Sequence, residues 1–336
     1  MICIEFCLGG YLMKLLGLHH VSILTGKAER NFQFYTKILG LRLVKKTVNQ
    51  DNTESYHLFY GDAKGSPGTE ITFFDIPGLG HTYPGVGSIS STSLRVKDTQ
   101  ALHYWEERFN QFGIQHGQIE KRNNRDSLAF QDFEGTRLVL VADNGEAGAG
   151  PGVPWDKSDV PVENAIIGLG PVTLTVAVPE KTVTVLTEVM GFTQAGTYPS
   201  LEGDFPAIQV FTTGEGGPGA EVHIETRPDL PRMRAGRGSV HHVAFRVPNE
   251  EEYEYWAKRI ADSGLMNSGK VERYYFKALY FREPNHILFE LSTDTPGFDV
   301  DEPVETLGEK LALPPFLEPR RADIEAKLRP LDLEIQ

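Results

Sequence analysis

"GLHHVSIL" at residues 17–24 places two adjacent histidines before a short apolar run, and the same pattern returns as "SVHHVAFRV" at residues 239–247. These two copies use four of the ten histidines in the chain. Each run has the length and the β-branched composition of a short strand. Two similar strands so far apart in one chain indicate that the sequence is built from internal repeats.

The repeat has four copies, each beginning with a β-rich run. In every copy a stretch with helical apolar spacing follows and stops at a glycine, which is a common end for a helix. Further β-rich runs close each copy. The first strands are predicted at 18–24, 89–96, 170–178 and 240–247, the helices end at Gly40, Gly113, Gly191 and Gly264, and the last strands are predicted at 69–76, 136–143, 220–226 and 286–293.

This order of elements predicts an α+β fold of four βαβββ modules, paired into two curved-sheet barrels. The Gly- and Pro-rich stretch at 144–155 separates modules two and three. In the C-terminal segment, Leu311, Leu313 and Phe316 are expected to pack on the body. The predicted divisions are an N-terminal extension at 1–13, modules one and two at 14–150, modules three and four at 151–296, and a C-terminal packing segment at 297–336.

Charge and cysteine content restrict the environment and the partners of the chain. The formal net charge is −13 and there is no basic cluster, which argues against nucleic acid and anionic membranes as partners. Cys3 and Cys7 both lie within the first seven residues and cannot cross-link the body of the fold, which suits the reducing cytoplasm. The sequence leaves open whether the chain assembles into a homo-oligomer.

The paired histidines are not required by the repeat itself. Alignment of the first strands places His20 and His242 at equivalent positions, where modules two and three carry Thr92 and Val172. Because two of the four modules do without histidine, a structural role explains the pairs poorly. Two imidazoles from two modules can instead bind one divalent metal.

A carboxylate ligand is available in the last strand of module four. Glu290 lies inside the apolar run "HILFELST" (286–293), where a buried carboxylate without a partner is costly. Two histidines and one carboxylate form the facial triad of non-haem Fe(II) oxygenases, and Mn(II) accepts the same ligands. The strand register leaves His19 and His241 as alternatives to His20 and His242. At the place of Glu290 the other modules are expected to carry Phe73, Val139 and Ile224.

Four such modules, with candidate ligands on first and last strands, resemble the vicinal oxygen chelate superfamily, which includes glyoxalase I and type I extradiol dioxygenases. The stretch "LYFREPNHILFE" (279–290) is similar to the second half of the extradiol ring-cleavage signature. Two departures are His286, where glycine or proline is usual, and the lack of the upstream signature histidine, in whose place stand Val271 or Arg273. The residues that fit are Leu279, Tyr280, Glu283, Pro284 and Glu290.

The doubled histidines and an arginine seven residues before Tyr280 resemble the hydroquinone-type ring-cleaving dioxygenase branch, as do "KKTVNQD" (45–51) and "LPPFLE" (313–318). The resemblance implies iron as the metal, with a small aromatic molecule and O2 as substrates. By the same resemblance His20, His242 and Glu290 correspond to the iron ligands, and His19, His241, Arg273 and Tyr280 correspond to catalytic groups around the substrate.

The favoured hypothesis is an Fe(II)-dependent, extradiol-type dioxygenase that acts on a hydroquinone or catechol in detoxification or catabolism. The alternatives are a glyoxalase-like isomerase or thiol transferase, and a non-catalytic protein that binds aromatics or quinones. Modules one and four must then pair around the metal, and modules two and three would form either a second, metal-free cavity or a supporting barrel. His57 has no partner in the repeat pattern and is interpreted as a solvated or capping histidine.

Overall fold

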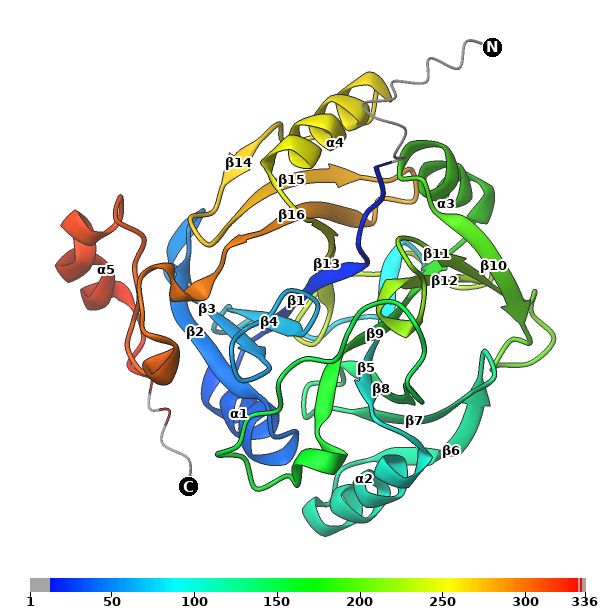
Figure 1. Cartoon of the computed structure of the whole chain (residues 1–336), viewed down its shortest axis with the longest axis horizontal. Helices are drawn as coiled ribbons and strands as arrows, with labels where there is room; N and C mark the ends of the chain where they lie inside the picture. Colours follow the sequence, from blue (N-terminus) through cyan, green and yellow to red (C-terminus); the bar gives the residue numbers. More distant parts are fainter. Residues whose placement is uncertain (1–12, 332, 334–336) are drawn as a thin grey trace.

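Two curved eight-stranded sheets stand side by side in the computed structural model, which describes residues 13–331 and 333 (Figure 1). Helices lie on the outer sides of both sheets, so that each sheet turns its concave face inward (Figure 1). Most of the predicted N-terminal extension, residues 1–12, lies outside the described residues. None of the helices in the described part of the chain is long and apolar enough to cross a bilayer.

The first sheet joins module one to module four, in the order β14-β15-β16-β13-β1-β4-β3-β2. Its central strands β1 and β13 are antiparallel, and each is parallel to the last strand of its own module. The strands are β1 (Leu18–Thr25), β2 (Arg42–Asn49), β3 (Asn52–Gly61), β4 (Glu70–Asp75), β13 (Val240–Val247), β14 (Val271–Glu272), β15 (Phe276–Arg282) and β16 (Leu288–Pro296).

The second sheet joins modules two and three in the same way, in the order β10-β11-β12-β9-β5-β8-β7-β6. Here β5 and β9 are the central antiparallel pair. The strands are β5 (Ser88–Val96), β6 (His116–Arg122), β7 (Arg125–Gln131), β8 (Arg137–Ala142), β9 (Ile166–Val176), β10 (Thr193–Tyr198), β11 (Ile208–Thr212) and β12 (Glu221–Thr226).

One helical segment covers each module. In the helix of module two, α2 (Thr99–Phe112), Trp105 and Phe109 are fully buried. Asp98 caps the start of this helix by accepting a hydrogen bond from the Ala101 amide. The glycines predicted to end the helices all have positive φ, at which a Cβ would be strained. The segments are α1 (Ala28–Phe32) with the π-helical η1 (Gln33–Ile38), α2 (Thr99–Phe112), α3 (Pro179–Thr184) with the π-helical η3 (Val185–Val189), and α4 (Glu250–Asp262).

The C-terminal segment adds α5 (Arg321–Lys327) outside the first sheet (Figure 1). Leu313 is buried and Leu311 is partly buried, as expected, whereas the expectation for Phe316 is wrong, because that ring is 55% exposed. A turn in which the Leu317 amide donates to the Pro314 carbonyl directs Leu313 and Leu317 inward. The short 3-10 helices are η2 (Val162–Asn164), η4 (Pro218–Ala220), η5 (Phe298–Val300), η6 (Val304–Thr306) and η7 (Glu318–Arg320).

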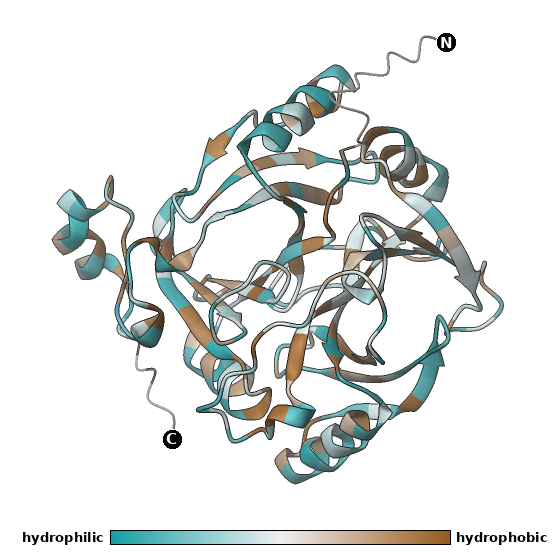
Figure 2. Ribbon diagram, in the orientation of Figure 1, coloured by the Kyte–Doolittle hydropathy of each residue, from teal (hydrophilic) through white to brown (hydrophobic). Residues whose placement is uncertain are grey.

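The predicted α+β fold of four βαβββ modules is confirmed, and so is the pairing of module one with four and of two with three. Apolar residues lie mainly on the strands, while α4 and α5 are largely hydrophilic (Figure 2). Because each sheet takes one module from either side of the linker, the segments 14–150 and 151–296 are divisions of the sequence, and each supplies half of both sheets.

A buried lysine fastens the C-terminal segment to the first sheet. The side chain of Lys45 on β2 is fully buried and pairs with Asp301, at 2.6 Å, and with Glu302. Its ammonium also lies 4.8 Å from the centre of the Tyr275 ring. Removing one partner of a buried ion pair leaves the other charges uncompensated, which is strongly destabilising.

We therefore expect Lys45→Met to lower the free energy of unfolding by about 3 kcal/mol. Urea unfolding measures this change. The matched control is Lys46→Met, because the neighbouring lysine is only partly buried and contacts just the Glu309 carbonyl. We expect the control to change stability by about 0.5 kcal/mol or less. Equal stability of the two variants would contradict the proposed fastening.

Candidate metal centre

His20, His242 and Glu290 meet in the concave face of the first sheet. His20 lies on β1, His242 on the neighbouring β13, and Glu290 on β16 beside β13. Glu290 Oε2 is 2.9 Å from His242 Nε2 and 3.3 Å from His20 Nε2, and the two Nε2 atoms are 3.3 Å apart. All three side chains are buried. Strands from opposite ends of the chain thus bring three ligand atoms together.

The three atoms fit a divalent metal by their spacing and chemistry. Donor atoms bound to one ion at about 2.1 Å, at right angles or tetrahedrally, lie about 3.0–3.4 Å apart. Glu290 Oε1 accepts a hydrogen bond from Ser292 at 2.7 Å, whereas the buried Oε2 has no hydrogen-bond donor among the described residues. Burial alone would raise the pKa of Glu290, but the adjacent His20 and His242 hold this pKa well below its usual range. Glu290 is therefore ionised and could bind a divalent metal.

The first histidine of each pair contacts the second through its Nδ1, and in the His19–His20 pair the contacts fix the tautomer that a metal needs. His19 Nε2 donates to the Thr293 carbonyl at 3.2 Å, so its Nδ1 can accept the Nδ1 proton of His20 at 2.9 Å. That arrangement leaves the His20 Nε2 lone pair facing Glu290. His241 and His242 repeat the contact, with their Nδ1 atoms 2.8 Å apart. The register ambiguity is thus removed, because His20 and His242 face the carboxylate and His19 and His241 support them.

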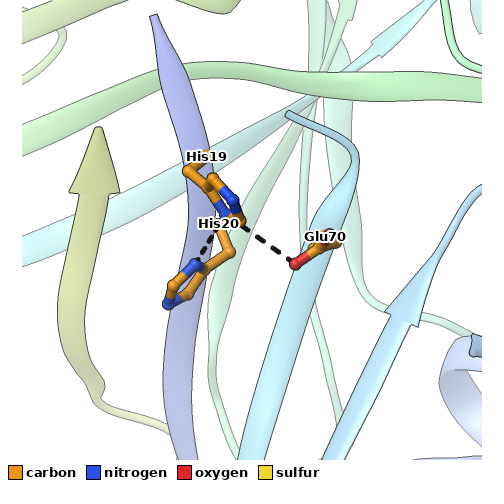
Figure 3. Close-up of side chains that lie close together, drawn as sticks. All are labelled: His19, His20 and Glu70. Carbon is orange, nitrogen blue, oxygen red and sulfur yellow. Dashed lines mark hydrogen bonds and ion pairs between the residues drawn. The ribbon is translucent and has the colours of Figure 1, made fainter. Parts of the chain in front are cut away.

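A second group of potential ligands consists of His19, His20 and Glu70 (Figure 3). Here the Nδ1 atoms of the two histidines already bond one another, and Glu70 Oε2 lies 3.9 Å from His19 Nδ1. Burial, followed by repulsion from Asp62, raises the pKa of Glu70 well above its usual value. A protonated carboxyl beside occupied imidazoles binds metal poorly, so the group containing Glu290 is the better centre.

The strand register corrects the position that matches Glu290 in module one. Ser22, two residues after His20, pairs with Thr72, as Ala244, two residues after His242, pairs with Glu290. Thr72, and not the predicted Phe73, therefore holds this place. Because side chains alternate between the faces of a strand, an error of one residue had moved the position to the helix side, where Phe73 lies in the core. Thr72 provides no carboxylate that could be a fourth ligand.

The predictions for modules two and three contain the same error at three of four positions. α1 begins eight residues after His20, and α4 begins eight residues after His242. Counting eight residues back from the starts of α2 and α3 gives Ser91 and Pro171, whereas the predicted positions were Thr92 and Val172. At the place of Glu290 the register gives Val139, as predicted, and His223 instead of Ile224.

Arg273 and Tyr280 lie beside the centre, at the outer end of a cavity that His20 and His242 also line. Arg273 Nε donates to the Tyr280 hydroxyl at 3.2 Å, and its other nitrogens form a two-pronged pair with Asp51 at 2.8 and 3.0 Å. The Tyr280 ring centre is 5.7 Å from that of His242. Burial raises the pKa of Tyr280 above its usual range, so its hydroxyl keeps its proton. The structure therefore places a proton donor next to the metal ligands.

His57, interpreted from the sequence as a solvated or capping histidine, lies inside β3 and lines this cavity, so that interpretation is wrong. Its ring lies between Phe59 and Phe74, at centroid distances of 3.9 and 4.1 Å, and Nε2 contacts Thr72 Oγ1 at 2.9 Å. The alternation "YHLF" at 56–59 was the available signal, since it puts His57 and Phe59 on one face of β3. The cavity measures about 40 Å³, which admits only a few water molecules while the Arg273–Asp51 pair is closed.

His57 gives the metal-free protein a defined pH dependence. Burial lowers the pKa of His57 well below its usual value. Below pH of about 6.5, His57 is therefore protonated in the unfolded chain but stays neutral in the folded protein. The contribution of His57 to the free energy of unfolding therefore falls by up to about 1.4 kcal/mol for each pH unit below that value. When the pH is lowered from about 7.5 to about 5, we expect the free energy of unfolding of the unsubstituted protein to fall by about 1–2 kcal/mol more than that of His57→Gln. Urea unfolding at both pH values measures this; a difference between the proteins that does not change with pH would refute the assignment.

Fold and site together define a class of proteins in which paired βαβββ modules hold a divalent metal between their first and last strands. The family model for the Glyoxalase/Bleomycin resistance protein/Dioxygenase superfamily matches residues 17–140 and 168–291. The chain belongs to this superfamily, whose enzymes bind a metal. The resemblance seen in the sequence is thereby confirmed.

Individual relatives are more specific. The chain is 57% identical to Bacillus subtilis (strain 168) MhqA, provisionally named a ring-cleaving dioxygenase, over 95% of this chain and 100% of MhqA. It is 30% identical to the chlorohydroquinone/hydroquinone 1,2-dioxygenase of Sphingobium indicum, over 91% of this chain and 93% of that protein. A crystal structure from Bacillus subtilis, provisionally titled a dioxygenase, superposes with a TM-score of 0.87 at 36% identity, over 97% of this chain and 100% of the other. Glyoxalase I from Zea mays, at 14% identity over 83% of this chain and 92% of its own and a TM-score of 0.60, shares the fold.

Proposed function

We propose that this protein is an Fe(II)-dependent, extradiol-type ring-cleaving dioxygenase that acts on a hydroquinone- or catechol-like aromatic and inserts both atoms of O2. The observation that carries the proposal is the convergence of His20 Nε2, His242 Nε2 and Glu290 Oε2 within 3.3 Å of one another. The names of the relatives support the reaction and the substrate class. When bound, Fe(II) supplies a Lewis-acidic centre with positions left for a substrate hydroxyl and O2.

The surrounding side chains have separate tasks in this proposal. Tyr280 donates its hydroxyl hydrogen to a substrate oxygen, and Arg273 holds that hydroxyl through Nε and stabilises negative charge on the opening ring. His241 contacts His242 on one side and is exposed on the other; because partial burial and His242 lower its pKa to about 3, it passes protons between the site and solvent as a neutral imidazole. Phe59, Phe74 and Phe276 exclude water around the ring. Admission of the ring requires the Arg273–Asp51 pair to open.

The proposal separates from its alternatives at the fourth ligand position. Glyoxalase-like isomerases and thiol transferases of this fold usually use a fourth protein ligand, whereas Thr72 is engaged with Ser22 at 2.7 Å and with His57 at 2.9 Å. A site with three protein ligands leaves room for two exogenous molecules, which a dioxygenase needs.

Oxygen uptake tests the function. Protein purified without oxygen and reconstituted with Fe(II) is expected to consume one O2 for each methylhydroquinone and to release a ring-opened acid. Tyr280→Phe, which retains the metal ligands, is expected to lower kcat by about 10²-fold because it removes the proton donor. If protein with stoichiometric iron consumes no O2 with any hydroquinone or catechol of a broad panel, the proposal fails.

A further inference from the structure

The concave face of the second sheet encloses a cavity of about 520 Å³, far larger than the one at the metal centre. Its size is typical of sites that bind a small molecule. The positions equivalent to the metal ligands are present here, but they carry Ser91, Pro171 and Val139, with His223 at the fourth. Among the described residues this face gathers no group of metal ligands, so any ligand must be recognised in another way.

Most charges that line this cavity are already compensated within the protein, so they have little attraction left for a ligand. Glu202 and Glu225 share Arg227, and the other two arginines each contact their own glutamates directly. The pairs are Arg122 with Glu120, Arg125 with Glu146 and Glu221, Arg227 with Glu202 and, at 4.0 Å, with Glu225, which also accepts from Thr175.

A buried relay ends at the cavity wall on Tyr198. Glu221 accepts two hydrogen bonds from Arg125 and one contact from His223 Nε2 at 2.9 Å, and these partners lower the pKa of the carboxyl to about 2 against the opposing effect of burial. The ionised carboxylate fixes the proton on His223 Nε2. His223 Nδ1 in turn lies 3.0 Å from the Tyr198 hydroxyl, within hydrogen-bond distance. Whichever partner donates in this contact, the Tyr198 oxygen keeps a lone pair that can accept a hydrogen bond from a molecule in the cavity.

Several hydrogen-bond donors that line the cavity have no side-chain partner among the described residues, among them Gln115, Gln131, Arg137 and Ser93. The Arg137 guanidinium at the start of β8 forms no ion pair or hydrogen bond there, and neither does the hydroxyl of the buried Ser93 on β5. Apolar side chains form part of the wall between these groups, among them Phe130, Val139 and Ile208. The unused features thus include the cation of the exposed Arg137, the hydroxyl of Ser93 on the adjacent strand, the Tyr198 oxygen and an apolar surface.

We propose that this cavity is a second, metal-free binding site for a small aromatic carboxylate that carries a hydroxyl group. Arg137 and Ser93 bind the carboxylate, and the Tyr198 oxygen accepts the hydroxyl hydrogen. The apolar wall contacts the ring. The site is independent of the metal centre, because it uses only modules two and three.

Calorimetric titration of the full-length protein with 4-hydroxybenzoate tests the site, with benzoate and phenol as probes that each lack one polar group. We expect one saturable site with a Kd of about 1 mM or lower, and weaker binding of both truncated probes. Arg137→Gln should weaken 4-hydroxybenzoate about tenfold and leave phenol unchanged, because a charge-assisted hydrogen bond is lost. Tyr198→Phe should weaken 4-hydroxybenzoate about fivefold and leave benzoate unchanged.

Glu290→Gln locates the bound probe, since it disrupts the metal centre and leaves the second sheet unaltered. Unchanged affinity in this variant supports the second site, whereas loss of binding assigns the probe to the metal centre and overturns the proposal. Absence of saturable binding to the unsubstituted protein, or equal affinity of the Arg137→Gln variant, overturns it as well. Thermal unfolding of each variant confirms that the compared proteins are folded.

Discussion

Glu290→Gln is expected to reduce the metal content of the purified protein from about one ion per chain to less than about a tenth of that. The amide keeps the volume of the carboxyl and still accepts a hydrogen bond from Ser292, which contacts Oε1 at 2.7 Å. What disappears is the negative charge of Oε2, which lies between two imidazole nitrogens. Elemental analysis measures the ion. Added Fe(II) at about 100 times its Kd should stabilise the unsubstituted protein by about 2.7 kcal/mol and leave the variant unchanged.

Glu70→Gln is the matched control, because Glu70 is also buried and lies beside His19, which is on the same strand as His20. Both substitutions remove one buried carboxyl from the concave face of one sheet. We expect Glu70→Gln to retain its metal and its activity, since its carboxyl is protonated and 3.9 Å from the nearest imidazole nitrogen. Metal loss in Glu70→Gln with retention in Glu290→Gln would move the centre to the cluster of His19, His20 and Glu70.

The repeat pattern was sufficient to predict the fold and the convergence of the site. A histidine doublet at two strand starts and a glutamate inside an apolar strand are anomalies of composition, and such anomalies survive errors of alignment. The two histidines favoured from the sequence, His20 and His242, do face the glutamate, but His19 and His241 stayed open as alternatives because one residue of register exchanges the two faces of a strand. The same uncertainty put Phe73 where the sheet places Thr72.

Other features of the site depend on contacts between segments that no local pattern records. Asp51 in the turn between β2 and β3 meets Arg273, 222 positions along the chain. His57 lies near the centre because β3 is next to β4 in the sheet, and its Nε2 contacts Thr72 on β4. Glu70 is directly opposite His20 in the β1–β4 ladder. These are properties of the curved sheet, which the strand sequences alone do not specify.

His241→Leu is expected to weaken metal binding by about 10–100-fold, although His241 contributes no ligand atom. Its Nδ1 lies 2.8 Å from His242 Nδ1 and can accept the proton of that atom, which would leave the His242 Nε2 lone pair for the ion beside Glu290. Without this acceptor the ligand imidazole can rotate, or can place its proton on the nitrogen that should bind the ion. Competition with a metal chelator measures the affinity, and oxygen uptake at saturating Fe(II) measures the remaining kcat.

His241→Asn is the conservative counterpart, because an asparagine oxygen can occupy the place of the histidine Nδ1 and accept the same proton. We expect this variant to recover most of the metal affinity but not the kcat, since an amide accepts the hydrogen bond and yet cannot carry protons between the site and solvent. The two readouts therefore separate the role in positioning His242 from the role in proton transfer. Equal affinities of the leucine and asparagine variants would show that the contact with His242 does not orient the ligand.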